Sequence, residues 1–187
     1  MIKKNIKRNE ESFILRLQNI PIATTMKMIS FPFNFEIFFI TVSIFIFIRV
    51  VTKRDLIFLA FGQTILVILK FTFCRTRPFN NNLFINNLTD KNYRNTSFPS
   101  GHSFLASLFC TLLLENKKIK NNKILSTITR IVPFLVAVSR VYLGVHYPSD
   151  VLGGLLLGYL YHKIFRNKFN RIDFKKIFNI KKKEKKK

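Results

Sequence analysis

Acidic residues and cysteines are scarce in this chain of 187 residues. Its 9 Asp and Glu stand against 32 Lys and Arg, and the sequence shows no carboxylate cluster that could hold a divalent ion. The two cysteines, Cys74 and Cys110, lie in apolar stretches without the spacing of a metal or redox motif. We therefore predict two ordinary buried thiols and expect neither a metal nor another cofactor.

The charge excess by itself is typical of a soluble nucleic-acid-binding protein. Hydrophobic residues make up 48% of the chain, however, and its 22 Phe gather with other apolar residues in long runs. Such runs need a deep core or a bilayer, and a chain of this length cannot build several layers of core. The composition therefore favours a small membrane protein of one domain with basic margins, and it argues against a nucleic-acid partner.

Apolar segments of about the length that spans a bilayer, roughly 17 to 25 residues, recur along the chain. They cover residues 35–51, 56–74, 101–114, 124–138 and 151–165. The third is short, which indicates a span that is tilted or begins inside a sunken pocket. In the fifth, Gly154 and Gly158 have the spacing that allows close helix packing. We predict an all-α, polytopic helix bundle with five clear spans.

Basic residues predict the orientation, because Lys and Arg collect in cytoplasmic loops. They cluster at 53–54, 117–123 and 163–187, which leaves the loops 75–102 and 139–150 on the outer face. The basic N-terminus is also expected inside, so parity favours a sixth crossing within residues 12–31, with an amphipathic interfacial helix as the alternative. The predicted divisions are an N-terminal region 1–34, a membrane core 35–165 and a cytoplasmic tail 166–187.

The first outer loop begins with cations. Lys70 and Arg77 flank the end of the second span, and Pro78 fixes the chain directly after them. A guanidinium binds phosphate bidentately and an ammonium acts as a point charge, so the pair could cradle a phosphate. The alternative is a snorkelling lysine with an interfacial arginine.

The same loop ends in Phe-Pro-Ser-Gly-His-Ser, directly before an apolar helix. Ser100 is a favoured N-cap residue, and the free amides of the first helical turn form an anion site. Gly101 lets the backbone approach a phosphate closely. His102 then lies where a proton must reach a leaving oxygen, although a capped helix with an exposed histidine would give the same string.

The second outer loop carries a histidine and a carboxylate. Pro148 suits a first helical position, which places His146 just before the last span and Asp150 in its first turn. A carboxylate there can orient one imidazole nitrogen and leave the other free to attack. Arg140 adds a cation. A lone His-Asp pair can also be structural, and His162, on the last span, is expected to be structural.

Taken together, the three strings form one ordered pattern. It reads K-x6-R-P from Lys70, P-S-G-H from Pro99 and S-R-x5-H-x3-D from Ser139 to Asp150. This pattern resembles the three signature motifs of the type-2 phosphatidic acid phosphatase superfamily, without a departure at any motif position. The resemblance covers roughly residues 56–165.

The resemblance implies a role for each motif residue. His146 would attack phosphorus to give a phosphohistidine, assisted by Asp150, and His102 would protonate the leaving group and then help to activate water. The phosphoryl oxygens would be bound by Lys70, Arg77, Ser100, Gly101 and Arg140. The cations and backbone amides would replace the charge stabilisation of a metal.

Two other classes of protein deserve comparison. Soluble acid phosphatases and vanadium haloperoxidases share this site, but the apolar spans around the motifs disfavour both. A non-enzymatic basic membrane protein, whose tail Lys181–Lys187 contacts anionic lipid or nucleic acid, would not need the motifs. We expect a lipid phosphate as substrate, with phosphatidate, phosphatidylglycerophosphate, undecaprenyl diphosphate and lipid A phosphate all open. The Lys, Asn, Ile and Phe content suggests a bacterial inner membrane.

Overall fold

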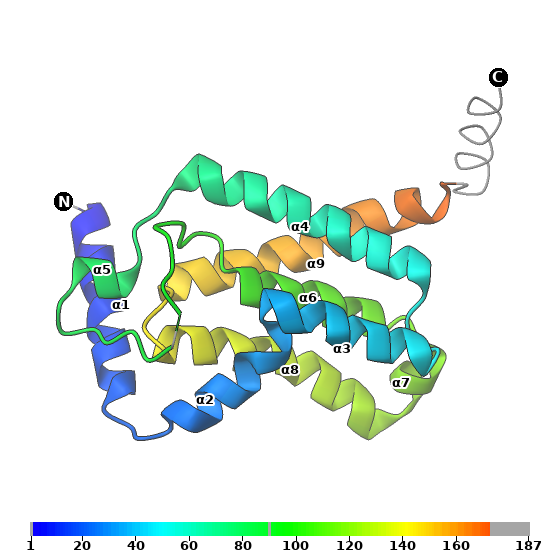
Figure 1. Ribbon diagram of the computed structural model, residues 1–187, viewed down its shortest axis with the longest axis horizontal. Coiled ribbons are helices and arrows are strands. Elements are labelled where there is room, and N and C mark those ends of the chain that lie inside the picture. Colours follow the sequence, from blue (N-terminus) through cyan, green and yellow to red (C-terminus); the bar gives the residue numbers. More distant parts are fainter. Residues whose placement is uncertain (1, 90, 173–187) are drawn as a thin grey trace.

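The computed structural model describes residues 2–89 and 91–172, and within them every regular element is helical (Figure 1). The elements that run lengthwise are α3 (Phe35–Phe47), α4 (Lys53–Phe73), α6 (Gly101–Leu113), α8 (Lys123–Tyr142) and α9 (Pro148–Asn170). The shorter or transverse ones are α1 (Ile2–Gln18), α2 (Ala23–Ser30), the 3-10 turn η1 (Phe31–Phe33), α5 (Pro78–Asn81) and α7 (Lys117–Asn121). The predicted all-α fold is confirmed.

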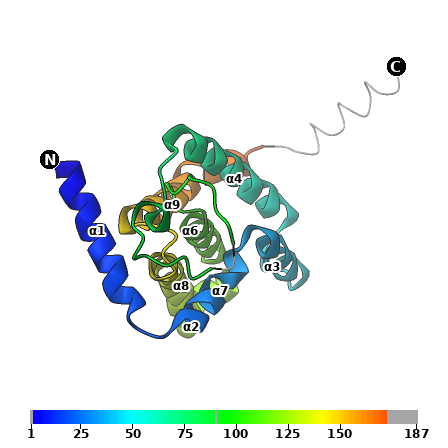
Figure 2. The ribbon, with the colours of Figure 1, turned by 60° about the vertical axis from the view of Figure 1, so that its left-hand side comes forward.

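Helix α6 is the centre of the bundle, with α3, α4, α8 and α9 around it (Figure 2). Each residue from Ser103 to Cys110 is buried. The rings of Phe38 and Phe45 meet Phe109 edge-on, at centroid distances of 5.6 and 5.2 Å. Because its 13 residues extend only about 20 Å at roughly 1.5 Å per residue, α6 is shorter than a bilayer core. Its start instead lies inside the bundle, which fits a sunken pocket.

Glycines let α9 approach α6 closely. A Cβ atom at Gly154 would lie 2.5 Å from the carbonyl oxygen of Ser100, and one at Gly158 would lie 2.6 Å from that of Phe104. Between them, the hydroxyl of Ser107 donates to the carbonyl oxygen of Leu155 over 2.8 Å. The glycine spacing therefore marks a real helix contact, as predicted.

We expect Gly158→Ala to destabilise the protein by about 1 to 3 kcal/mol, because the new methyl group meets backbone rather than a movable side chain. Thermal unfolding in detergent measures the change. Leu156→Ala, at a neighbouring side chain that is 58% exposed, is the matched control and should barely change the melting temperature. Equal melting of both variants would contradict close packing at Gly158.

The outer faces of several helices remain apolar. Phe61, Ile68 and Phe71 on α4 are 57 to 60% exposed, and Ile128 and Phe134 on α8 are 52 and 63% exposed. By length and composition, Lys53–Asn81 and Lys123–Tyr142 could each cross a membrane, and the pair Ala23–Phe33 and Phe35–Phe47, bent by 62°, could form a third span. An apolar exterior of this extent suits contact with lipid.

The N-terminal region differs from the predicted sixth crossing. Residues 12–31 do not form one helix, since the chain breaks at 19–22 between α1 and α2. Figure 1 places α1 across the end of the bundle that holds α5 and the start of α9, away from the C-terminal end of α9. With the N-terminus at that end, parity no longer calls for a sixth crossing, and the alternative of a helix lying along the surface fits better.

An ionic cluster joins the helices at the opposite end. Arg166 pairs with Asp55 and Glu115, each at 2.7 Å, and His162 Nε2 lies 2.9 Å from Glu115 Oε1. His162 thus has a structural contact far from the motifs, as expected. Arg166 belongs to α9 and to the bundle, although the sequence assigned it to the tail. The lysine run at 181–187 lies outside the described residues.

Candidate active site

The motif residues gather at one end of the bundle from separate elements. Lys70 is near the end of α4, Arg77 precedes α5, Ser100 caps α6, Gly101 and His102 open α6, Arg140 is in the last turn of α8, His146 precedes α9, and Asp150 is in its first turn. The predicted loop 139–150 is shorter than expected, because α8 continues to Tyr142. The extra turn is a regular continuation of the apolar helix and carries Arg140 on it.

A cavity of about 240 Å³ contains most of these groups. Its polar lining includes Lys70, Arg77, Gly101, His102 and His146. Its apolar walls include Phe33, Leu66 and Leu105. The structure thus brings two histidines and two cations around one space, whereas Ser100 and Asp150 are fully buried behind it.

Ser100 performs the capping task that the sequence predicts. Its Oγ accepts hydrogen bonds from the backbone N–H of Ser103 over 3.5 Å and from the Ser103 hydroxyl over 3.0 Å. Its own N–H donates to the backbone carbonyl of Asp150 over 3.0 Å. Ser100 therefore joins the start of α6 to the start of α9, and its predicted contact with phosphate stays a prediction.

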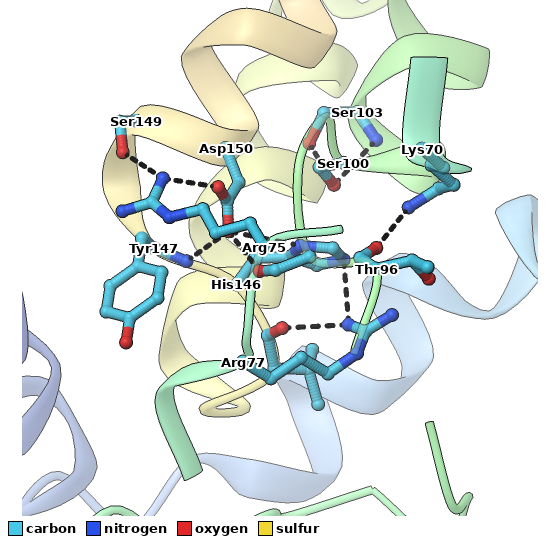
Figure 3. Close-up of polar contacts among 12 residues, drawn as sticks. Lys70, Arg75, Arg77, Thr96, Ser100, Ser103, His146, Tyr147, Ser149 and Asp150 are labelled. Atoms are coloured by element: carbon cyan, nitrogen blue, oxygen red, sulfur yellow. Dashed lines mark hydrogen bonds and ion pairs between the residues drawn. The ribbon is translucent and has the colours of Figure 1, made fainter. Parts of the chain in front are cut away.

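His146 lies between a carboxylate and a guanidinium (Figure 3). Its Nδ1 is 3.6 Å from Asp150 Oδ2, and its Nε2 is 3.4 Å from Arg77 Nη1. Because a guanidinium can only donate, we assign the proton to Nδ1 and the free lone pair to Nε2. Burial, and then the charges of Arg77, Lys70 and Arg140, hold the pKa of His146 well below its usual range. The shift favours the neutral imidazole, which is the form that has a free lone pair for nucleophilic attack.

Backbone carbonyls hold the two cations of the cavity. Lys70 Nζ donates to the carbonyl oxygen of Thr96 over 2.8 Å. Arg77 donates from Nε to the carbonyl of Arg94 and from Nη1 to that of Val145, both over 2.9 Å. Within residues 2–89 and 91–172 neither cation forms an ion pair with a carboxylate, so positive charge remains available for an anion.

Arg140 is placed apart from the other predicted site residues. Its guanidinium donates to Ser30 Oγ over 3.2 Å and to the Tyr93 hydroxyl over 3.0 Å, and it lines a different cavity of about 340 Å³. Tyr93 lines both cavities. The centroid of its ring lies 4.4 Å from Arg77 Cζ and 5.9 Å from Arg140 Cζ. The structure thus does not bring Arg140 to His146, and its predicted role in binding phosphate stays a prediction.

The sequence reasoning missed several residues that touch the motif side chains. Asn34 Oδ1 lies 2.9 Å from His102 Nε2, and Tyr93 separates Arg77 from Arg140. Arg75 Nη1 donates to Asp150 Oδ1 over 2.6 Å. Only Arg75 had a signal, as a third basic residue within the first motif, whereas Asn34 and Tyr93 are not part of any motif.

Across residues 2–89 and 91–172 the structure contains no group of three or more His, Cys, Asp or Glu side chains that could hold a metal ion. Of the two cysteines, Cys110 is buried as predicted, whereas Cys74 is exposed because it ends α4 in a left-handed turn.

Comparison with known sequences gives a consistent result. The sequence model of the PAP2 superfamily matches residues 54–173. The undecaprenyl-diphosphatase of Sulfolobus acidocaldarius is 35% identical over 165 residues, which cover 83% of this chain and 76% of that protein. Phosphatidylglycerophosphatase B of Bacillus subtilis is 43% identical over 70 residues, and the match spans only 34% of either chain.

Two solved structures have the same fold. The crystal structure of a transmembrane PAP2 type phosphatidylglycerolphosphate phosphatase from Bacillus subtilis aligns with a TM-score of 0.71 and 25% identity, over 91% of this chain and 89% of that one. The structure of Aquifex aeolicus LpxE aligns with a TM-score of 0.68 and 24% identity, over 82% of this chain and 92% of that one. The likeness to the second concerns the fold alone.

Proposed function

The chain belongs to the PAP2 superfamily and is a membrane phosphatase, and from this premise we propose that it hydrolyses a lipid phosphate through a phosphohistidine on His146. The observation that carries the proposal is the shared cavity, in which His146 Nε2 lies beside Arg77 with His102 also in the lining. A nucleophile, a proton donor and a phosphate-binding cation thus surround one space. These are the three parts that phosphoryl transfer needs.

In the first step, the lone pair on His146 Nε2 attacks phosphorus and the bond from phosphorus to the leaving oxygen breaks. His102 donates a proton to that oxygen, so the lipid leaves as an alcohol or as the shorter phosphate. Asp150 stabilises the positive charge that develops on the imidazole, whose Nδ1 faces it. Asn34 accepts from His102 Nε2 and fixes the orientation of that ring.

In the second step, water attacks the phosphorus of the phosphohistidine. His102, now neutral, takes a proton from the water, and the bond between nitrogen and phosphorus breaks. Inorganic phosphate leaves, and both histidines return to their starting protonation states. The two steps together consume one water molecule and need no other reactant.

Protein cations supply the charge stabilisation during both steps. Lys70 and Arg77 line the cavity, and the free amides at the start of α6 face the same space, so the phosphoryl oxygens meet positive charge on two sides. Ser100 and Gly101 hold that helical turn in place. Arg140 would join them if Tyr93 moved aside, since the guanidinium groups of Arg77 and Arg140 both lie near the ring of that tyrosine.

A metal-independent mechanism predicts that chelation has no effect. We expect purified enzyme to release phosphate from lipid substrate at an unchanged rate after dialysis against EDTA, because side chains do the work of a metal. A parallel assay with added magnesium should give the same rate within about twofold. Loss of activity on dialysis and its return with a divalent ion would contradict the mechanism.

The physiological substrate is one of several lipid phosphates. Phosphatidate, phosphatidylglycerophosphate, undecaprenyl diphosphate and lipid A phosphate all present a phosphate on an apolar anchor. Phosphate release from each, measured with purified protein in detergent, tests the proposal and ranks the four. A soluble phosphatase or haloperoxidase does not need the apolar exterior of α4 and α8, and a non-enzymatic basic protein would release no phosphate from any of them.

We also propose a plasma-membrane location with the active site on the outer face and the C-terminal tail in the cytoplasm. The short basic segments at 53–54 and 117–123 lie at the end of the bundle away from the cavity (Figure 1), which supports this orientation under the positive-inside rule. A membrane-impermeant reagent tests it, with cysteines introduced near Asn86 and near Asn121 of a protein in which the exposed Cys74 is replaced by serine. Only the first should react in intact cells.

A further inference from the structure

Arg75 lies behind the catalytic residues and links two helices that are far apart in the sequence. From one nitrogen, Nη1, it donates to Asp150 Oδ1 over 2.6 Å and to Ser149 Oγ over 2.7 Å (Figure 3). Its other nitrogen, Nη2, donates to Glu10 Oε2 on α1 over 3.0 Å. The guanidinium also stacks on the ring of Tyr147, at 4.2 Å from the centroid. Every part of this fork is therefore held in place.

The contacts of Asp150 divide between its two oxygens. Oδ2 faces His146, and it also accepts hydrogen bonds from the backbone N–H of Tyr147 over 2.9 Å and from the hydroxyl of Ser97. Oδ1 accepts from Arg75. A carboxylate is planar, so fixing Oδ1 also fixes the rotation that turns Oδ2 towards the imidazole.

Glu10 makes two contacts next to Asp150, one with Arg75 and one with Ser149. Besides Arg75, it accepts a hydrogen bond at Oε1 from the backbone N–H of Ser149 over 2.8 Å, which is a free amide in the first turn of α9. Its side chain is only 11% exposed. Glu10 lies on the N-terminal helix α1, outside residues 54–173, the part of the chain that matches the family model.

We propose that Arg75 and Glu10 are positioning residues for the reaction, through which the N-terminal helix α1 fixes Asp150 against His146. Neither lines the cavity, so both act through Asp150 and not on the substrate. The inference rests on the proposed function, because it needs His146 to be the nucleophile. It assigns α1 a task in catalysis in addition to covering the end of the bundle.

The charges of Arg75 and Glu10 should each change how readily His146 is protonated, and this change can be measured. Asp150, Arg77, Lys70 and His102 surround His146, and the charge of the more distant Arg140 also acts on it. Arg75 offsets part of the charge of Asp150, and Glu10 in turn offsets part of the charge of Arg75. Removing the arginine should therefore favour the protonated imidazole, whereas removing the glutamate should disfavour it.

The experiment compares Arg75→Gln, Arg75→Lys and Glu10→Gln with wild type, as full-length proteins in detergent. Phosphate release from phosphatidate is measured against pH. We expect kcat to fall about 10- to 100-fold in Arg75→Gln and about 3- to 10-fold in Glu10→Gln, because a hydrogen bond to a charged group is lost. KM should stay within about twofold. Arg75→Lys should recover part of kcat, since its ammonium can still reach Asp150 but cannot hold three partners.

The pH profiles separate positioning from simple loss of structure. The acidic limb of kcat/KM, which reports the free enzyme, should move to higher pH in Arg75→Gln and to lower pH in Glu10→Gln. A protein that is merely loosened would lose activity without opposite shifts. The ionisation of the substrate is the same in every variant, so the difference between variants belongs to the enzyme.

Glu11→Gln is the matched control, because it removes the same charge one residue away on α1. Glu11 contacts the Tyr147 hydroxyl and the Asn82 amide but not Arg75 or Asp150. We expect its kcat and acidic limb to match wild type within about twofold. Melting temperatures of all variants show which of them are folded, and Glu10→Gln alone suffices if Arg75→Gln does not fold.

Two results would overturn the inference. One is an acidic limb that shifts in neither Arg75→Gln nor Glu10→Gln, whether kcat falls or stays within twofold of wild type. The other is a change in KM alone, which would make Arg75 a substrate contact. A failure of the proposed function looks different, because His146→Ala would then remain active whatever the effect at Arg75.

Discussion

Replacing His146 by alanine is expected to abolish phosphate release from every lipid phosphate tested, with a loss of about 10⁶-fold, as when a catalytic nucleophile is removed elsewhere. His146 is the proposed nucleophile, and its Nε2 lies beside Arg77 in the cavity that His102 also lines. Water alone would then have to attack, without an intermediate. Release of inorganic phosphate from purified protein in detergent measures the loss.

The covalent intermediate gives a second measurement of the same prediction. Wild-type enzyme quenched during turnover of a labelled substrate should carry phosphate on histidine, and His146→Ala should carry none. His162→Ala is the matched control, because that imidazole faces Glu115 at the other end of the bundle. It should keep both activity and labelling. Full activity of His146→Ala would refute the mechanism.

The fold class could be predicted from the sequence because the apolar runs are local features of the chain and most of them are long. The runs 56–74 and 124–138 correspond to helices α4 and α8. Gly154 and Gly158, at the predicted spacing, lie where α9 contacts α6. The family resemblance carried by the three motifs is also confirmed, by the match over residues 54–173. These features depend on neighbours in the chain, which the sequence displays directly.

The position of α1 could not be read in the same way. Its basic residues suggested the cytoplasmic side, but Glu10, Glu11 and Gln18 tie it to the site end of the bundle through partners such as Ser149, Asn82 and Asn86. These contacts join residues that are 68 to 139 positions apart. A count of basic residues cannot predict these contacts, because it ignores the acidic residues between them, such as Glu10 and Glu11, and their partners elsewhere in the fold.

The sequence predicted which motif residues come together, but not all of the contacts that they make in the structure. The motif residues do gather at one end of the bundle, where Lys70, Arg77, His102 and His146 line one cavity. The motifs gave no sign that Tyr93 would stand before Arg140, or that Asn34 would reach His102. Tyr93 and Asn34 come from parts of the chain without a motif, so only the packed structure could reveal them.

Replacing His102 by glutamine is expected to slow hydrolysis of lipid phosphates by about 10²- to 10⁴-fold, the usual contribution of a general acid or base. Alkoxide leaves poorly without a proton, and glutamine has none to give. The variant keeps a polar group near Asn34, so the cavity should stay intact and KM should change little. Steady-state phosphate release from phosphatidate measures the effect.

A substrate with a better leaving group distinguishes the two proposed tasks of His102, which are to protonate the leaving oxygen and to activate water. Nitrophenolate departs without a proton, so nitrophenyl phosphate should still phosphorylate His146 in the His102→Gln variant. The second step, which needs His102 to activate water, stays slow. We therefore expect a burst of nitrophenol equal to the amount of enzyme, followed by slow turnover.

Asn34→Ala provides the control, because it keeps the imidazole and removes only its 2.9 Å partner. It should slow lipid hydrolysis less than His102→Gln does and should give no marked burst, since a misaligned histidine weakens both proton transfers together. If His102→Gln instead lost activity equally on both substrates, without a burst, His102 would be binding the phosphate and not moving the proton. The size of the burst therefore decides between these two roles for the only other imidazole in the cavity.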